Sequence, residues 1–170
     1  NTELPLQVTR QVLGWMRPVD PAPLTLGTLP VWAIDCPGEG QLYGFPIADG
    51  VPGPSGFKAA MHAAGDPADP HTIDRQASAG DESSFLDRVR RWIPAAGTEV
   101  ETMRICMYTN TVDEHFILDR HPEFEHVTIA TGFSGHGFKM SSVIGEVLAD
   151  MSTEGRTGHP VDFLGHGRFA

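Results

Sequence analysis

The chain has few cysteines and few basic residues. Only two of its 170 residues are cysteine, Cys36 and Cys106. They are too few for the disulfide framework of a small secreted domain or for a cysteine-rich zinc site. Lysine and arginine together number 12 against 22 aspartate and glutamate, a formal net charge of −10. Because this charge repels phosphate backbones and anionic headgroups, we expect neither a nucleic acid nor a membrane surface as partner.

Long apolar runs and a leader pattern are absent too. No uninterrupted apolar stretch approaches the length of a membrane span. The chain opens at Asn1 without the charged-then-apolar leader of a secreted protein. Together with the isolated cysteines, these features favour a reducing, cytoplasmic setting. Apolar residues nevertheless make up 40% of the chain, which is enough to bury the core of one domain, or of a domain and a further piece.

Short apolar segments between glycine- and proline-rich turns indicate an antiparallel sheet. Strands are predicted at residues 4–16, 31–35, 41–45, 57–62, 100–108, 116–119, 127–130 and 161–164, and the strand at 127–130 is expected to be buried. Along residues 57–62, the two-residue period places Lys58 and His62 on one face and Phe57 on the other. A lysine at such a position is either solvated or, inside an apolar pocket, a strong local charge with a shifted pKa.

Two amphipathic helices accompany the strands. The first is predicted at residues 83–93, opened by Ser83 or Ser84 as N-cap and stopped by Pro94. The second, at residues 140–151, has apolar residues at three- and four-residue spacing and therefore one buried face.

These elements predict an α+β fold in two domains. Residues 1–125 form an antiparallel sheet domain with flanking helices, and residues 126–170 form a strand–turn–helix unit. A unit of that kind packs on a larger sheet, which the rest of this chain does not obviously supply. We therefore expect the C-terminal unit to complete a domain that is partly missing.

A glycine-rich turn, Gly132-Phe-Ser-Gly-His-Gly-Phe-Lys139, precedes the second helix. Glycines let the backbone approach a ligand, and a helix start offers unpaired N–H groups that suit an anion. A tight strand-to-helix turn without a ligand explains the same pattern. The dinucleotide fingerprint Gly-x-Gly-x-x-Gly is absent, because Met140 takes the place of the third glycine. Lys139, in the first turn of the helix, opposes the helix dipole, which favours a functional reason for its position.

Cys106 lies within a predicted strand. It is either a small buried apolar residue or a thiolate nucleophile beside a cation such as Arg104. A cysteine hydrolase could combine Cys106 with His115 or His136 and with Asp119, although no local signature supports that class. The eight histidines are scattered, without a His-x-His or an i, i+4 pair, so metal ligation is not expected.

Two long segments are more specific, residues 106–119 (CMYTNTVDEHFILD) and 131–140 (TGFSGHGFKM). With shorter matches at residues 42–46, 56–62, 145–146, 155–157 and 168–169, they resemble the monomeric sarcosine oxidase and N-methyltryptophan oxidase family. The resemblance spans nearly the whole chain and implies an FAD-dependent oxidase of secondary amino acids. The implied reaction passes a hydride from the amine C–H to flavin. The imine then hydrolyses to aldehyde and amine, and molecular oxygen is reduced to hydrogen peroxide.

The resemblance implies a role for each matching residue. Cys106 would join the flavin through a thioether, Lys58 would lie at the flavin face where oxygen reacts, and Lys139 would pair with the substrate carboxylate. The amine pocket would be lined by His62, Tyr43, Tyr108 and His136. The pyrimidine end of the flavin would face Gly135, His136, Gly137, Phe138 and Lys139 at the helix start.

The resemblance also implies that this is the C-terminal half of such an enzyme. The family's N-terminal Gly-x-Gly-x-x-Gly segment, which binds the ADP part of FAD, does not occur here. We expect the final strand and helix to complete a Rossmann-like FAD-binding domain with a missing half, on the same or a separate chain. Alone, the chain is expected to be inactive and to expose the apolar face of its last helix.

One alternative is a stand-alone, non-catalytic binding module of the same fold without flavin. The chain also departs from the family pattern at the turn over residues 50–56, which carries two prolines and is longer than usual. This turn can displace Lys58 or reshape the pocket, so the family pattern does not fix the exact amine.

Overall fold

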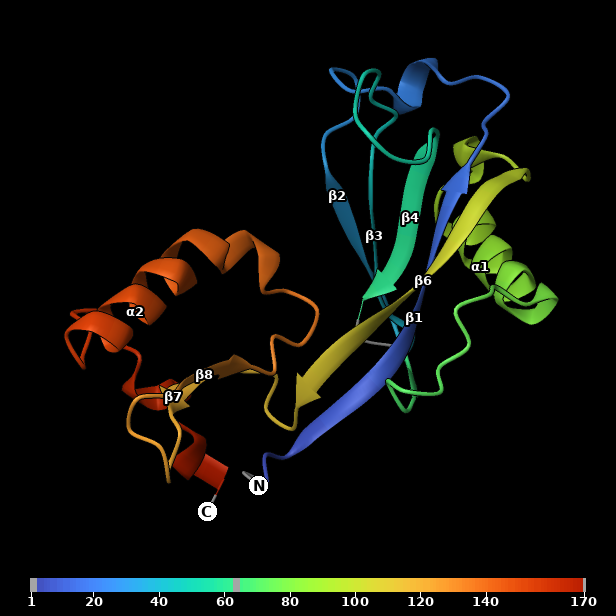
Figure 1. Cartoon of the computed structure of the whole chain (residues 1–170). Coiled ribbons are helices and arrows are strands. Elements are labelled where there is room, and N and C mark those ends of the chain that lie inside the picture. Colours follow the sequence, from blue (N-terminus) through green and yellow to red (C-terminus); the bar gives the residue numbers. More distant parts are fainter. Residues whose placement is uncertain (1–2, 63–64, 170) are drawn as a thin grey trace. The chain divides into compact units, whose positions relative to one another are not determined.

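The computed structural model describes residues 3–62 and 65–169 (Figure 1). Its strands are β1 (Leu6–Met16), β2 (Trp32–Cys36), β3 (Gly40–Phe45), β4 (Phe57–His62), β5 (Asp66–Pro67), β6 (Val100–Thr111), β7 (Ile117–Arg120) and β8 (Thr128–Thr131). Its α-helices are α1 (Ala79–Trp92) and α2 (Ser141–Thr153). Short 3-10 helices include η3 (Phe138–Met140), η4 (Asp162–Leu164) and η5 (His166–Phe169). The predicted α+β class is confirmed.

The chain forms two compact units. The sheet unit comprises Arg10–Met107, and the C-terminal unit comprises the described residues up to Thr9 and those from Tyr108 onward. β7 and β8 lie on either side of the domain boundary predicted between residues 125 and 126, yet they pair within the C-terminal unit. Where the domains of the complete protein divide stays a prediction.

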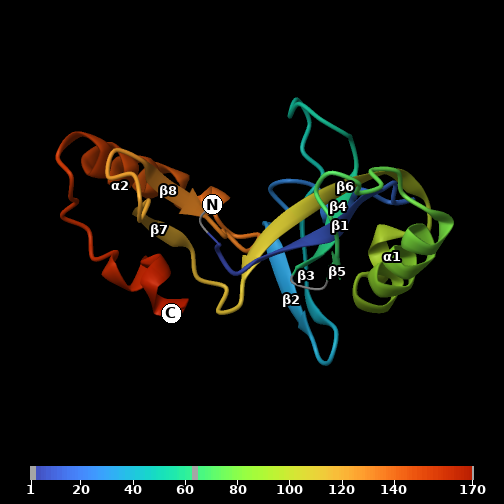
Figure 2. The same ribbon diagram turned by 60° about the horizontal axis from the view of Figure 1, so that its bottom comes forward.

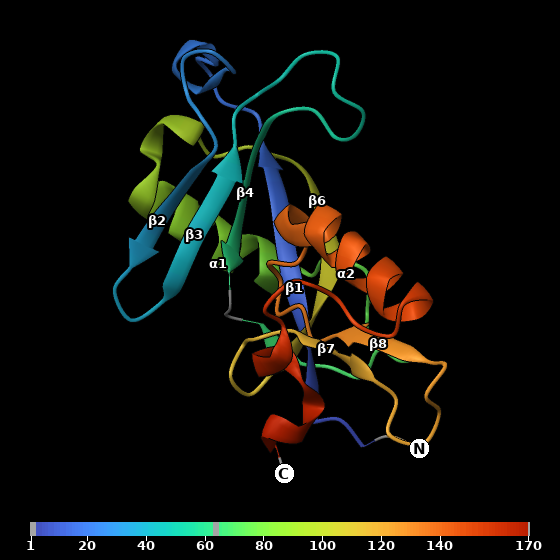
Figure 3. The ribbon, with the colours of Figure 1, turned by 90° about the vertical axis from the view of Figure 1, so that its left-hand side faces the viewer.

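An antiparallel sheet is the framework of the sheet unit. Its strands run in the order β2–β3–β4–β1–β5, and β6 also pairs with β1. The predicted hairpin and its third strand are confirmed as β2, β3 and β4 (Figure 3). In the register, Lys58 of β4 lies between two opposing residues, Trp15 of β1 and Phe45 of β3.

Helix α1 covers one face of this sheet (Figures 1 and 3). Phe85 and Val89 of the helix form a buried cluster with Met16, Phe57 and Ala59 of the strands. Phe57 and Ala59 are fully buried, so the predicted alternation along β4 is confirmed on its apolar side. Lys58 and His62, on the opposite face, are half-buried.

Helix α1 begins four residues before the predicted N-cap, and that prediction is wrong. Ser78 is the N-cap: its Oγ accepts from the Asp81 N–H at 3.1 Å, and the Asp81 carboxylate accepts from the Ser78 N–H at 2.8 Å. Arg10 donates to both Asp81 oxygens, at 2.7 and 2.9 Å. Arg10 lies in β1, far from Asp81 in the sequence. Its contact with Asp81 supports the capping box at Ser78, and among the described residues no such contact supports a cap at Ser83 or Ser84.

In the C-terminal unit, helix α2 lies along the two-stranded β7–β8 ribbon (Figures 1 and 2). The buried cluster there consists of Phe116, Leu118, Ile144, Val147 and Leu164. The expectation that the apolar face of this helix is exposed is therefore wrong. Ile144 and Val147 are covered by the ribbon and by the C-terminal segment, which sequence periodicity alone does not reveal.

Two further strand predictions need correction. Residues 161–164 form no strand; the Leu164 N–H donates to the Val161 carbonyl at 2.8 Å, which closes the 3-10 helix η4 instead. β8 is a strand as predicted but is half-buried, and Val127 before it is 36% exposed, because the β7–β8 sheet has only two strands and α2 to cover it. Among the described helices, none combines the length and apolar character that crossing a membrane requires.

Candidate functional site

Lys58 lies between two aromatic rings on the sheet face opposite α1. Its Nζ is 4.9 Å from the centroid of the Phe45 ring and 5.3 Å from that of Trp15. Both rings come from residues that pair directly with Lys58 across the sheet. Cation–π attraction of this kind favours the ammonium form and restricts its position.

Tyr43 and His62 lie on the same sheet face as Lys58. The register places Tyr43 opposite Ala60, and both Lys58 and His62 are two residues away from Ala60 on β4. The Tyr43 and His62 rings meet edge to face, with centroids 6.3 Å apart and an interplanar angle of 87°. Three of the predicted site residues are thus brought to one surface, which carries an imidazole (His62), a phenol (Tyr43) and an ammonium group (Lys58).

Burial lowers the pKa of Lys58, and electrostatic interaction with Cys106 raises it by a smaller amount. The Cys106 thiol therefore lies close enough to Lys58 to interact electrostatically. Cys106 is exposed, so its interpretation as a small buried apolar residue is wrong. Arg104, the cation first considered for this thiol, donates instead to Thr102 Oγ1 at 3.3 Å and to the Met103 carbonyl at 3.2 Å.

A cavity of about 460 Å³ opens beside Lys58. Its walls are Trp15, Leu26, Val31, Phe45, Lys58 and the loop over residues 46–56, which includes the proline-containing turn at residues 50–56. Figure 3 shows this loop rising beyond the ends of β3 and β4. The loop thus builds one side of the space that Lys58 faces.

In the C-terminal unit, the glycine-rich turn follows β8 with an unusual backbone. Gly132, Ser134 and Gly135 have φ values of +66°, +47° and +77°, a region that favours glycine. A Cβ on Gly135 would lie 2.3 Å from a ring carbon of Tyr108. The turn therefore packs directly on Tyr108, and only glycine allows that approach.

The His136 ring is fixed within this turn. Its Nε2 is 3.1 Å from the Glu114 carbonyl oxygen, and because a carbonyl only accepts, Nε2 carries a proton. The ring also lies 5.0 Å from the ring of Phe116, which in turn packs at 4.9 Å on Phe133. Tyr108, Gly135 and His136 thus lie together in the C-terminal unit.

Phe138 and Lys139 form part of η3, ahead of α2. Lys139 was expected in the first turn of the long helix, which is wrong: α2 begins at Ser141. Both side chains are exposed, Phe138 to 94%. A large apolar side chain and a cation therefore stand in solvent beside the turn, where they contribute no packing to this unit's buried cluster.

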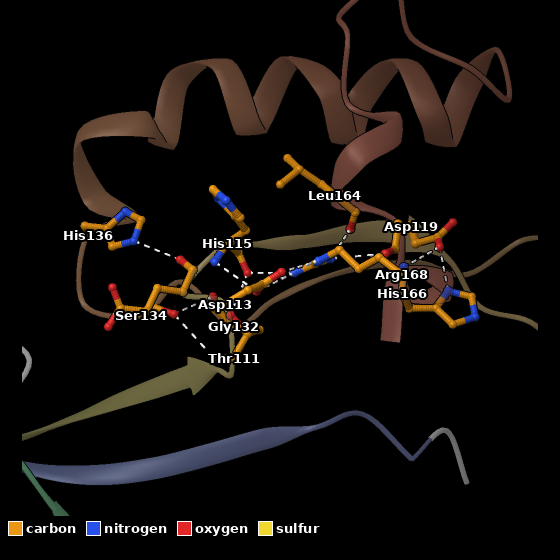
Figure 4. Close-up of polar contacts among 12 residues, drawn as sticks. Thr111, Asp113, His115, Asp119, Gly132, Ser134, His136, Leu164, His166 and Arg168 are labelled. Atoms are coloured by element: carbon orange, nitrogen blue, oxygen red, sulfur yellow. Dashed lines mark hydrogen bonds and ion pairs between the residues drawn. The ribbon is translucent and has the colours of Figure 1, made fainter. Parts of the chain in front are cut away.

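The hydrolase hypothesis finds no support in the C-terminal unit. Asp119, its proposed carboxylate, accepts from the backbone N–H of His166 at 2.9 Å and contacts its Nδ1 at 2.5 Å. His136 contacts the Glu114 carbonyl instead (Figure 4). Over the part of the chain that the structure describes, no group of three or more metal-ligating side chains converges on one point.

Sequence reasoning missed three residues of these sites, Trp15, Phe45 and Glu114. The first two could have been found by aligning the strands, because both share a face with Lys58 once the register is set. Glu114 contributes a backbone carbonyl, for which no side-chain pattern exists.

The chain matches known proteins over nearly its full length. The model of the family "FAD dependent oxidoreductase" matches residues 2–151. Monomeric sarcosine oxidase of Bacillus sp. (strain NS-129) is 39% identical over 172 residues, which cover 100% of this chain and 43% of the relative. N-methyl-L-tryptophan oxidase of Escherichia coli (strain K12 / DH10B) is 31% identical, over 89% of this chain and 40% of the relative. The chain thus spans less than half the length of these relatives.

A solved structure supports the fold independently. L-proline dehydrogenase from P. horikoshii superimposes with a TM-score of 0.77 at 24% identity, covering 99% of this chain and 41% of that protein. At this identity the likeness concerns the fold alone, and the share covered again indicates part of a larger fold.

Proposed function

Because the chain belongs to the FAD dependent oxidoreductase family, we propose that it is the C-terminal portion of an oxidase of secondary, N-methylated amino acids such as sarcosine. The observation that carries this proposal is the sheet face with Lys58, Tyr43 and His62, beside the exposed Cys106 thiol. A lysine on the sheet face away from the helix, with a pKa shifted by burial and an exposed thiol that interacts with it, is expected for catalysis rather than for packing.

The residues present fit FAD. An exposed thiol beside a half-buried ammonium suits covalent attachment to the ring and reaction near it. In the C-terminal unit, Gly135 leaves the backbone open and Phe138 offers an apolar surface. When bound, FAD accepts two electrons from the amine and delivers them to oxygen.

The chain's own groups act on the substrate and on oxygen. The Lys58 ammonium, held between Trp15 and Phe45, stabilises the negative charge that develops on oxygen during its reduction. Lys139 pairs with the substrate carboxylate, its charge being available because the side chain is exposed. Tyr43 and His62 line the amine pocket from the sheet unit. The family resemblance implies the same role for Tyr108 and His136.

The rest of the oxidase is supplied by a FAD-binding half that this chain does not contain. Support comes from the length relation: the chain covers 43% of the sarcosine oxidase that it matches. We propose that the β8–α2 unit completes the FAD-binding domain and that the chain is inactive without its other half. The two cysteines are free, in keeping with the cytoplasmic setting that we propose.

Intact mass of the complete flavoprotein tests the proposal. Cys106 is replaced by serine, with Cys36→Ser as the matched control, because Cys36 is buried and only 3% exposed. We expect a mass increase of one flavin in the wild type and in the Cys36 variant but not in Cys106→Ser. Hydrogen peroxide release from sarcosine is measured on the same samples.

Two results would contradict parts of the proposal. If flavin stays covalently attached in Cys106→Ser, the linkage is formed by another residue. A complete protein that binds no flavin and yields no peroxide is instead the stand-alone binding module.

A further inference from the structure

Arg168, near the end of the chain, makes five hydrogen bonds, three of which tie η5 to the turn over residues 111–115 (Figure 4). Its Nε and Nη2 donate to the two Asp113 carboxylate oxygens at 2.8 and 3.2 Å. Nη1 donates to the carbonyls of Leu164 and Gly165, and Nη2 also donates to that of His115 at 2.9 Å. The Arg168 side chain is only 18% exposed, so this is a guanidinium with a fixed orientation.

The turn that Arg168 holds is also closed by its own residues. The Asp113 carboxylate accepts from the His115 N–H at 3.2 Å, and Thr111 Oγ1 donates to the His115 carbonyl at 2.8 Å. The hydrogen bond from Arg168 keeps the pKa of Asp113 well below its ordinary value. Glu114, at the tip, has φ of +59°, which a residue with a side chain adopts only when its surroundings impose it.

This conformation directs the Glu114 carbonyl toward His136 in the glycine-rich turn. The Glu114 carbonyl meets His136 Nε2 at 3.1 Å (Figure 4). A second link joins the same two turns, because the Thr111 N–H donates to the buried Ser134 Oγ at 3.4 Å and the Ser134 N–H to the Thr109 carbonyl at 3.0 Å. The glycine-rich turn is thereby connected to the C-terminal segment through residues 111–115.

We propose that Arg168 is a positioning residue that, through Asp113 and the Glu114 carbonyl, fixes the ring and tautomer of His136. The contacts run entirely within the C-terminal unit and need neither flavin nor substrate. The consequence for amine binding rests on the proposed function, in which His136 lines the pocket. Removal of Arg168 frees the turn, so that Glu114 no longer holds its left-handed conformation and its carbonyl leaves Nε2.

The test uses the complete protein labelled with ¹⁵N-histidine, with the His136 signals assigned by their loss in His136→Gln. The variants are Arg168→Ala, Arg168→Lys and Asp113→Asn, with Arg156→Ala as control, because Arg156 is an exposed arginine of the same unit. In the wild type, we expect the ring nitrogen shifts of the Nε2-protonated form. Arg168→Ala should move them toward a mixture of both tautomers. Arg168→Lys and Asp113→Asn should do so partly, and the control not at all.

The amine assay is read separately. With sarcosine, Arg168→Ala should raise KM on the order of 10-fold and change kcat less, because pocket lining is displaced while Lys58 is untouched. Unchanged His136 shifts in Arg168→Ala overturn the proposal. If that variant does not fold by circular dichroism, unchanged shifts in Arg168→Lys and Asp113→Asn do so. If the His136 shifts move in Arg168→Ala as expected but the wild type oxidises no sarcosine, the proposed function is refuted and the positioning role of Arg168 stands.

Discussion

Replacing Gly135 by alanine tests how tightly the glycine-rich turn packs on Tyr108. Gly135 has φ of +77°, and a Cβ built there lies 2.3 to 2.5 Å from three carbon atoms of the Tyr108 ring. Non-bonded carbons are most favourable at about 3.5–4.0 Å. The added methyl group therefore cannot be accommodated unless the ring or the turn moves.

The cost has two sources. The left-handed backbone is disfavoured for alanine by roughly 1–2 kcal/mol, and forcing a methyl group into a packed contact costs about 1–3 kcal/mol. The lower entropy of the unfolded chain returns about 0.4–1 kcal/mol. We therefore expect Gly135→Ala to lower the free energy of opening of the C-terminal unit by about 1–4 kcal/mol.

Hydrogen exchange is the suitable assay, because the three tryptophans, Trp15, Trp32 and Trp92, all belong to the sheet unit. Exchange of amides in β7 and α2 reports the opening of the C-terminal unit directly. Gly145→Ala is the matched control: Gly145 lies in α2, and apart from its chain neighbours and the helix's own backbone no atom of the described residues comes within 4 Å of an added Cβ. That variant should be neutral or stabilised by up to about 1 kcal/mol.

A double-mutant cycle with Tyr108→Ala separates the two costs. Without the ring, Gly135→Ala should retain only the backbone cost, giving a coupling of about 1–3 kcal/mol between the two positions. The reasoning is refuted if Gly135→Ala exchanges like Gly145→Ala. A cost that is undiminished in the Tyr108→Ala background would refute the contact with the ring.

Two further predictions concern the sheet unit. Lys58→Met in the complete oxidase should slow reoxidation by oxygen on the order of 10²-fold and reduction by sarcosine far less; equal slowing of both half-reactions in stopped-flow measurements argues against the oxygen-site assignment. Asp81→Ala should destabilise this unit by about 2–4 kcal/mol, since it removes the side chain that completes the capping box with Ser78 and leaves the guanidinium of Arg10 without the carboxylate that it pairs with. The hydrogen bond from Arg10 holds the pKa of Asp81 well below its ordinary value. The stabilisation is therefore complete above about pH 4 and is lost as the pH falls further. Urea unfolding followed by tryptophan fluorescence should show this loss of stability at acidic pH in the wild type only. If the stability of Asp81→Ala falls with the same pH slope, the prediction is contradicted.

The family, the strand alternation around Lys58 and the glycine-rich turn were all predictable from the sequence, because each depends on neighbouring residues. A two-residue period assigns Lys58 and Phe57 to opposite faces wherever the strand lies. The glycines at 132 and 135 indicate a left-handed turn because other residues adopt that backbone only at a cost.

What surrounds these residues was decided by the tertiary structure. The rings that flank Lys58 come from two other strands, so their identity depends on the sheet register. Ser78 caps α1 because Arg10, 71 residues from Asp81, completes its capping box. The tautomer of His136 depends on a carbonyl whose direction Arg168 sets from the end of the chain. Local patterns determine which face a side chain takes, but charge, tautomer and packing depend on groups that only folding brings within a few ångströms.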